Sequence, residues 1–322
     1  MTAITNGAQA TLLPNVDGGR HPLHAPERTW TEINCYVDLW IELLHAWGLD
    51  PRPASVCALS AGFVDDQWTF LKHHPEDLRR LYGIEVGELT VWRPVLDHVE
   101  EHLGRGRLLT VEVDAWWLPD TAGTTYRTQH DKTTIVPARL DRAGRTLSYF
   151  HNAGVFELEG DDFDGVFAEQ PLAPYVEVIR AERMAPAADV FTVTHQLVGE
   201  HLRRRPPDNP LEALAQRVEA DSAWLATRDA ETFHRYAFAM LRQCGGTAAL
   251  AADLVAWLGG SGGTGLEQAE AAFTAVSEQA KVVQFQLARV ARGRRVGLRP
   301  ALEPMIEGWR TGIEQVVAWY DR

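Results

Sequence analysis

The sequence lacks several features that would define other classes of protein. Its 322 residues include three widely spaced cysteines, too few for a disulfide framework, which favours a reducing compartment. No run reaches the roughly 20 apolar residues of a membrane-spanning helix, and the first residues lack the pattern of a secretory signal. The 31 Lys and Arg are outnumbered by 44 Asp and Glu, and the net charge of −13 argues against a nucleic-acid partner. We therefore expect a cytoplasmic protein without membrane or nucleic-acid partners.

Motifs of the common catalytic classes are also missing. The chain has no CxxC pair, no HExxH, no GxxxxGK[ST], no GxGxxG after a strand and no GxSxG. His73 and His74 have no further ligand at a recognised spacing, so we expect no metal and no other resident cofactor.

What is present has the composition of a globular protein, with 45% hydrophobic and 23% charged residues. Three stretches differ in texture. We expect residues 1–29 to be a poorly ordered leader, 30–187 to be a mixed domain of strands and helices, and 188–322 to be a helical bundle domain. The runs of strands and helices are not strictly alternating, which predicts the α+β class.

The spacing of apolar residues places individual elements. In the first domain it predicts helices over 34–47, 67–82 and 94–103, and strands over 56–59, 88–92, 108–113, 133–140, 146–150 and 175–179. The five-residue loop 141–145 contains a glycine, so the strands on either side of it should form a hairpin. In the second domain the spacing predicts helices over 188–204, 209–222, 228–243, 246–259, 264–292 and 299–320.

Cys35 is the first candidate for chemistry. It follows Asn34, a good N-cap residue, and so begins the first turn of a predicted helix. A helix N-terminus favours the thiolate form of a cysteine and offers backbone N–H groups to a developing oxyanion. The alternative is a small thiol that only packs, which is the interpretation we give to Cys57 and Cys244.

His130 and Asn152 flank the predicted hairpin. The start of one strand and the end of its partner lie at the same end of a hairpin, so the amide can approach and orient the imidazole. Strict pairing places Asn152 opposite Thr134, so this approach needs a splay or a bulge. His151 is the alternative base, although strand alternation turns it to the other face. A helix-start cysteine followed by these residues has the order of papain-like enzymes, with a mixed or antiparallel sheet.

The polar and aromatic segment 112–126 predicts a substrate cleft. Its candidate lining residues are Asp114, Trp116, Trp117 and Tyr126, and one of the two tryptophans would serve equally well as core filling. The backbone at Asn34 and Cys35 is expected to hold the oxyanion, with Gln67 as a further donor, unless Gln67 is only a capping residue.

Several segments together resemble the bacterial family DUF1839: residues 34–40, 66–71, 113–127, 130–134 and 149–154. A more distant similarity connects the region to the BtrH-type papain-like acyltransferases of butirosin biosynthesis. That similarity implies a nucleophile at Cys35, a base at His130 and substrates held as thioesters on a carrier protein. The BtrH-type pattern often has its histidine at the position where this chain has Thr133. The chain therefore departs from that pattern at the residue expected to act as the base.

The resulting hypothesis is a cysteine-dependent acyltransferase in a biosynthetic pathway. It would move an aminoacyl group from the phosphopantetheine thioester of an acyl or aminoacyl carrier protein to a small-molecule amine. A basic cluster at 289–299 would dock the acidic carrier, unless it is only a solvated helix end. Two alternatives remain: a cysteine hydrolase, either an amidase or a protease, that uses the same residues and water, and a non-catalytic binding module.

Overall fold

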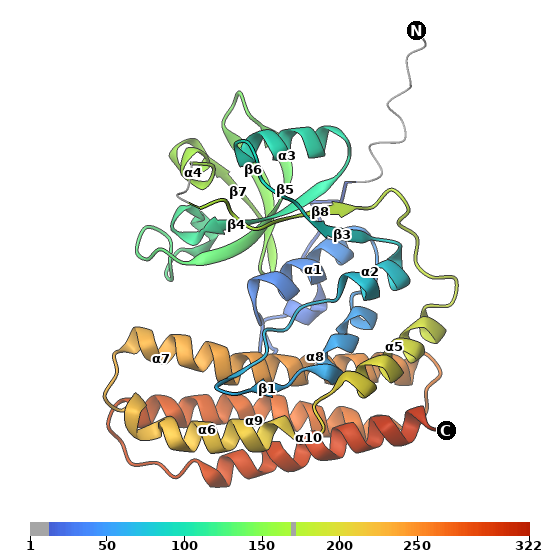
Figure 1. Ribbon diagram of the computed structural model, residues 1–322, viewed down its shortest axis with the longest axis vertical. Helices are drawn as coiled ribbons and strands as arrows, with labels where there is room; N and C mark the ends of the chain where they lie inside the picture. The colour runs from blue at the N-terminus through green and yellow to red at the C-terminus, as the bar shows by residue number, and fades with distance from the viewer. Residues whose placement is uncertain (1–12, 169–171) are drawn as a thin grey trace. The chain divides into compact units, whose positions relative to one another are not determined.

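The computed structural model describes residues 13–168 and 172–322, which form two compact units (Figure 1). Within the described residues, the sheet unit comprises 13–25, Asn34–Pro51 and His74–Ala187 without 169–171. The helical unit comprises Pro26–Ile33, Arg52–His73 and Ala188–Arg322. The predicted domains are continuous in sequence, whereas these units are interleaved. Residues 1–12 of the predicted leader lie outside the described residues.

A six-stranded antiparallel sheet organises the sheet unit. The strand order is β3-β8-β4-β5-β6-β7. The strands are β3 (Glu85–Glu88), β4 (Leu108–Asp114), β5 (Lys132–Asp141), β6 (Thr146–His151), β7 (Gly154–Glu159) and β8 (Val176–Arg180). The helical segments of this unit are η1 (Pro22–His24), α1 (Cys35–Ala46), α2 (Pro75–Tyr82), α3 (Val95–Gly104), η3 (Ala115–Trp117), η4 (Pro119–Thr121) and α4 (Gly160–Val166). The predicted α+β class is confirmed.

Helices cover both faces of this sheet. Side chains alternate between the faces of a strand, and one set, including Val111 and Ile135, packs with Val99 of α3 and Phe163 of α4. We call this side the α3/α4 face. The other side, which includes Thr134, lies toward α1, and α1 packs on β5 and β6. We call it the α1 face.

Helix α1 starts and ends where its sequence predicts. The Asn34 side chain accepts hydrogen bonds from the backbone N–H groups of Tyr36 and Val37, which caps the first turn. At the other end Gly48 takes a positive φ of 73°, a conformation that glycine adopts without steric cost. Nine consecutive residues between these ends are buried, so the helix is held by packing on several sides.

The described part of the leader packs on α1. The backbone N–H of Asn15 donates to the carbonyl of Ala46 at 3.0 Å. His24 is buried, with Nδ1 2.5 Å from Glu42 and Nε2 3.4 Å from Asp38. Both carboxylates come from α1. Residues 13–25 are therefore an integral strap of the sheet unit.

The helical unit contains six α-helices within the described residues beyond 188, as predicted. They are α5 (Val190–Arg204), α6 (Pro210–Leu225), α7 (Ala230–Ala237), α8 (Gln243–Gly260), α9 (Glu267–Ala291) and α10 (Arg299–Tyr320). A π-helical turn, η5 (Phe238–Arg242), joins α7 to α8. Earlier segments add η2 (Arg52–Ser60), β1 (Phe63–Val64) and β2 (Gln67–Trp68). Among the described residues, no helix is both long and apolar enough to span a membrane.

Three predicted elements are wrong. The apolar run 56–59 is part of the 3-10 segment η2, because two prolines, Pro51 and Pro53, break the chain around its start. The predicted helix 67–82 begins only at Pro75, since proline is tolerated in the first helical turn but ends a helix that precedes it. In place of the strand predicted over 88–92 the chain forms β3 over Glu85–Glu88, which pairs with β8 from Glu85 opposite Arg180 to Glu88 opposite Glu177.

The central hairpin is confirmed. Strands β5 and β6 pair antiparallel, with Val136 opposite Phe150. The register shifts between Pro137 and Arg139, and a bulge there accommodates a proline inside a central strand. Strand β7 was not predicted. It follows β6 after a turn of only two residues, so no long polar loop in the sequence marks where one strand ends and the next begins.

Candidate functional site

Cys35 is the first residue of α1, as predicted. Its thiol is partly exposed, and Sγ lies 3.8 Å from Oγ1 of Thr134 on β5. Because the Asn34 side chain already takes the N–H groups of Tyr36 and Val37, the N–H of Cys35 itself is the backbone donor left at this helix start. Of the two expected oxyanion donors, the N–H of Cys35 is the one that belongs to the first turn of the helix.

The residue after Cys35 anchors the helix start to the sheet. The Tyr36 hydroxyl donates to Glu177 of β8 at 2.7 Å, and Thr110 and Tyr175 donate to the same carboxylate at 3.1 and 2.9 Å. Burial and the neighbouring Glu177 raise the pKa of Tyr36, so the phenol stays a donor. Glu177 is 3% exposed. This buried network ties the first turn of α1 to the sheet, and so it also fixes the position of the Cys35 thiol.

His130 lies two residues before β5 and forms a dyad with Asp114, the last residue of β4. Nδ1 is 2.5 Å from Asp114 Oδ2, and the indole of Trp116 stacks on the imidazole with ring centroids 4.5 Å apart and an interplanar angle of 10°. The other oxygen of Asp114 accepts from the N–H of Trp116. The His130 side chain is 70% exposed. A histidine held at Nδ1 by a carboxylate has Nε2 available for proton transfer.

His151, the alternative base, belongs to a buried network. Its Nδ1 is 2.6 Å from Asp120 and its Nε2 is 2.7 Å from the hydroxyl of Thr133. Tyr149 donates to the second oxygen of Asp120. Both nitrogens of the imidazole are therefore occupied, and the side chain is 1% exposed.

Two consecutive threonines place Cys35 and His151 on opposite faces of the sheet. Thr134 contacts the thiol on the α1 face, and Thr133 contacts His151 on the α3/α4 face. Neighbouring residues of a strand point to opposite sides. The geometry thus favours His130 over His151 as a partner of Cys35.

Asn152 is a turn residue. His151 pairs with Gly154, so Asn152 and Ala153 form the whole connection between β6 and β7. Asn152 has a φ of 44°, in the left-handed region that asparagine enters more easily than other residues with a side chain beyond Cβ. The carboxylate partners of the two histidines are Asp114 and Asp120. Backbone conformation is sufficient reason for an asparagine here.

The other residues predicted to line the cleft do not lie together at one site. Trp116 stacks on His130. Trp117 packs on α4, where a Cβ added at Gly165 would lie 2.0 Å from the indole. Tyr126 donates to Asp162 of α4 at 2.8 Å. Gln67 is an exposed residue of β2 in the helical unit, not a helix start.

Two residues that contribute to the site, Thr134 and Asp120, are not identifiable from the sequence. Thr134, the hydrogen-bond partner of the thiol, was visible only as a strand residue opposite Asn152. Asp120 was hidden in a polar segment where several acids look alike. Thr134 reaches the cysteine because side chains alternate along β5, and Asp120 reaches His151 because it lies in the turn η4. Both contacts depend on the fold, so no local sequence pattern identifies these residues.

Comparison with known proteins gives a family match along most of the chain. The profile described as the DUF1839 N-terminal domain matches residues 19–181, and the DUF1839 C-terminal domain matches residues 187–318. Neither match extends the similarity to the BtrH-type acyltransferases. No curated protein matches the chain.

Proposed function

The chain belongs to the DUF1839 family, and on that premise we propose that it is a cysteine-dependent acyltransferase with Cys35 as nucleophile. The observation that carries the proposal is the placement of a partly exposed thiol at the first residue of a capped helix. A helix N-terminus stabilises a thiolate and the oxyanion that forms when the thiolate attacks a carbonyl. Cys57 and Cys244 are buried, so Cys35 is the cysteine that a substrate can reach.

The proposed base is His130. Its pairing with Asp114 and its stacking on Trp116 hold the ring, and its large exposure leaves Nε2 open. Asp114 takes the orienting role first considered for Asn152. The thiol itself contacts Thr134, four positions after His130 in the sequence. With His130 as base, its Nε2 has to come within hydrogen-bond reach of the thiol when substrate binds.

The chemistry has two steps. Cys35 loses its proton to His130 Nε2, and its sulfur forms a bond to the carbonyl carbon of a carrier-protein thioester. The carrier thiolate leaves as the acyl-enzyme forms and takes the proton from His130. An amine then attacks the acyl-enzyme, passes its proton to His130 and releases the Cys35 thiolate. Because a thioester reacts readily with nucleophiles, the protein has to supply less of the rate acceleration than peptide cleavage would need. With water as acceptor the same residues would make a hydrolase.

The proposed docking surface for the acidic carrier lies in the helical unit. Arg289, Arg292, Arg294 and Arg295 are exposed at the end of α9 and in the loop after it. Arg299, at the start of α10, is paired with Glu219 and Glu303 at 3.6 and 2.9 Å. The four exposed arginines provide local positive charge on a chain whose net charge is −13.

A second candidate function is a non-catalytic binding module. The observation that favours it is the hydrogen bond from Cys35 to Thr134, because the thiol has a hydroxyl neighbour in place of an imidazole. In that case Cys35 would serve packing and hydrogen bonding alone.

Mass spectrometry separates the two functions. The full chain is incubated with a set of aminoacyl thioesters of N-acetylcysteamine, and Cys35 is examined for a mass increase equal to the acyl group. The acyltransferase requires an adduct on Cys35 that disappears when an amine acceptor is added. A chain that forms no adduct with any thioester would leave the binding module as the remaining function.

Variants then assign the roles. Cys35→Ala should abolish the adduct, and His130→Ala should slow its formation about 100- to 10,000-fold, the usual worth of a general base. Asp114→Asn should have a smaller effect. His234→Ala is the matched control, since His234 is another exposed histidine, on α7. If His151→Ala were the crippling change and His130→Ala mild, the base would be misassigned while Cys35 remained the nucleophile.

A further inference from the structure

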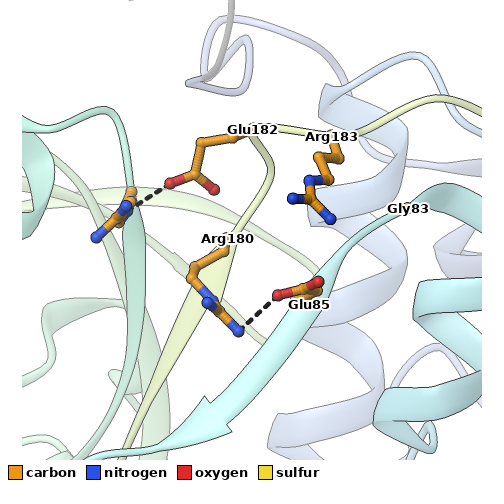
Figure 2. Close-up of a pocket in the computed structure, with 6 residues that line it drawn as sticks. Gly83, Glu85, Arg180, Glu182 and Arg183 are labelled. Carbon is orange, nitrogen blue, oxygen red and sulfur yellow. Dashed lines mark hydrogen bonds and ion pairs between the residues drawn. The ribbon is translucent and has the colours of Figure 1, made fainter.

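A small charged pocket lies at one end of the sheet, away from the cysteine. It has a volume of about 260 Å³ and is lined by Gly83, Glu85, Arg107, Arg180, Glu182 and Arg183 (Figure 2). Arg107 immediately precedes β4, whose far end carries Asp114. The pocket and the His130 dyad are thus at opposite ends of one strand. The pocket is not part of the proposed acyl-transfer site.

Its charges do not cancel. Three arginines and two glutamates line the pocket, which gives a net charge of +1. Arg180 pairs with Glu85 and Arg107 pairs with Glu182, each at 2.5 Å. In the described part of the chain Arg183 has no ion pair, and in Figure 2 its guanidinium lies on the side of the pocket where Glu182 and Glu85 are seen.

Each of the two paired arginines, Arg107 and Arg180, keeps N–H donors that its glutamate partner does not use. Partial burial raises the pKa of Glu182, but hydrogen bonding and the cation of Arg107 outweigh it, so the pKa lies below its ordinary value. The ion pair of Arg107 uses Nε, and that of Arg180 uses Nη2. Since a guanidinium has five N–H donors, both groups keep donors for a ligand.

The backbone that carries Arg183 is fixed. Gly83 ends α2 with a φ of 67°, and a Cβ added there would lie 2.4 Å from the Arg183 carbonyl oxygen. Next to it the N–H of Ala185 donates to the carbonyl of Tyr82 at 3.0 Å, and the N–H of Met184 donates to Ala181 at 2.9 Å. The close approach that glycine permits sets the position of the arginine in advance, which lowers the entropic cost of binding.

We propose that this pocket binds a small oxyanion, a carboxylate or a phosphate group, held by Arg183 and by the remaining donors of Arg107 and Arg180. The planar fork of N–H groups on arginine matches both kinds of oxyanion. A single negative charge would neutralise the pocket. The site stands independently of the function proposed for Cys35, because binding at this pocket is measured without any acyl transfer.

Calorimetric titration of the full chain with inorganic phosphate, and separately with acetate, tests the site at constant ionic strength. We expect saturable binding of at least one anion, and the arm that binds identifies the oxyanion. Arg183→Ala should weaken binding at least tenfold. The control Arg203→Ala removes an exposed arginine from α5 and should leave binding unchanged. Equal affinity in the wild type and Arg183→Ala, or no saturable binding of either anion, would overturn the proposal.

Two further variants separate a built site from general surface charge. Glu85→Gln releases Arg180 and raises the pocket charge to +2, so it should tighten binding several-fold. Gly83→Ala changes no charge but displaces the Arg183 carbonyl, so it should weaken binding. If Gly83→Ala fails to fold, Arg183→Ala and Glu85→Gln still decide the result. Unchanged affinity in Glu85→Gln would contradict the role assigned to Arg180.

Discussion

Raising the pH should weaken the sheet unit through one buried histidine, His24. Its ring lies between two carboxylates of α1, Glu42 at 2.5 Å and Asp38 at 3.4 Å. Burial disfavours the charged ring, but hydrogen bonds to these two carboxylates outweigh it and raise the pKa of His24 from 6.5 to about 9. A base whose pKa is higher in the folded chain stabilises that chain fully below its unfolded pKa. The stabilisation is then lost as the pH rises through about 9.

The size of the effect follows from the two pKa values. The rise for His24 corresponds to about 3 kcal/mol in the free energy of unfolding. Replacing the histidine with glutamine removes the cation and leaves two buried carboxylates, so His24→Gln should lower the free energy of unfolding by several kcal/mol at pH 6.5, on the scale of about 3 to 5 kcal/mol for a broken buried pair. The difference between the two proteins should shrink by about 3 kcal/mol toward pH 9.5.

Urea unfolding of the full chain, followed by tryptophan fluorescence between pH 6.5 and 9.5, measures this difference. The variant retains every other group that titrates in alkali, so it corrects for them. Parallel pH profiles for wild type and His24→Gln would refute the reasoning. In acid the neighbouring His21 acts in the opposite sense. Burial and His45 lower its pKa to about 4, so it should destabilise the fold as the pH falls from 6.5 toward 4.

Two more predictions concern the candidate site. Cys35 should react with iodoacetamide at least tenfold faster than the other cysteines, since Cys57 and Cys244 are buried and burial raises the pKa of Cys244; equal labelling of all three by peptide mass spectrometry would contradict the nucleophile assignment. Asn152→Gly should keep the wild-type rate of adduct formation, while Asn152→Ala should lose about 1 kcal/mol of stability, because alanine is strained at a φ of 44°. A large loss of adduct formation in Asn152→Gly would instead return the orienting role to the amide.

Periodic patterns with clear ends gave the reliable part of the fold prediction. Helix α1 was predicted because Asn34 and Gly48 mark its ends and apolar residues recur between them. The β5–β6 hairpin was predicted because a glycine-containing loop separates two strand-like runs. Where an apolar run had no period, as at 56–59, sequence could not distinguish a strand from a 3-10 segment. Strand β7 was missed because the turn before it spans two residues.

The candidate site was predictable only residue by residue. Cys35 could be identified from its cap, which is a local feature. The pairing of His130 with Asp114 depends on the register of β4 and β5, which places Lys132 opposite Asp114. The sequence contained all of these residues but did not specify their partners. The positive φ of Asn152 cannot be read from its residue type alone, so the sequence does not distinguish a turn residue from one that orients a histidine.

Because the two units are interleaved in sequence, part of the helical unit is synthesised long before the helices that it packs against. Trp68 of β2 is 2% exposed, its indole donates to Thr247 at 3.1 Å and its ring meets Trp309 edge-on at 5.7 Å. Both partners follow the entire sheet unit in sequence, so at ordinary rates of translation Trp68 waits at least about 10 s for Trp309. During that time the apolar side chains within residues 52–73, such as Val56, Leu59 and Trp68, lack the helices that cover them in the folded chain. A fragment ending at residue 187 would remain in that state permanently, and we expect such a fragment to bind chaperones or to aggregate.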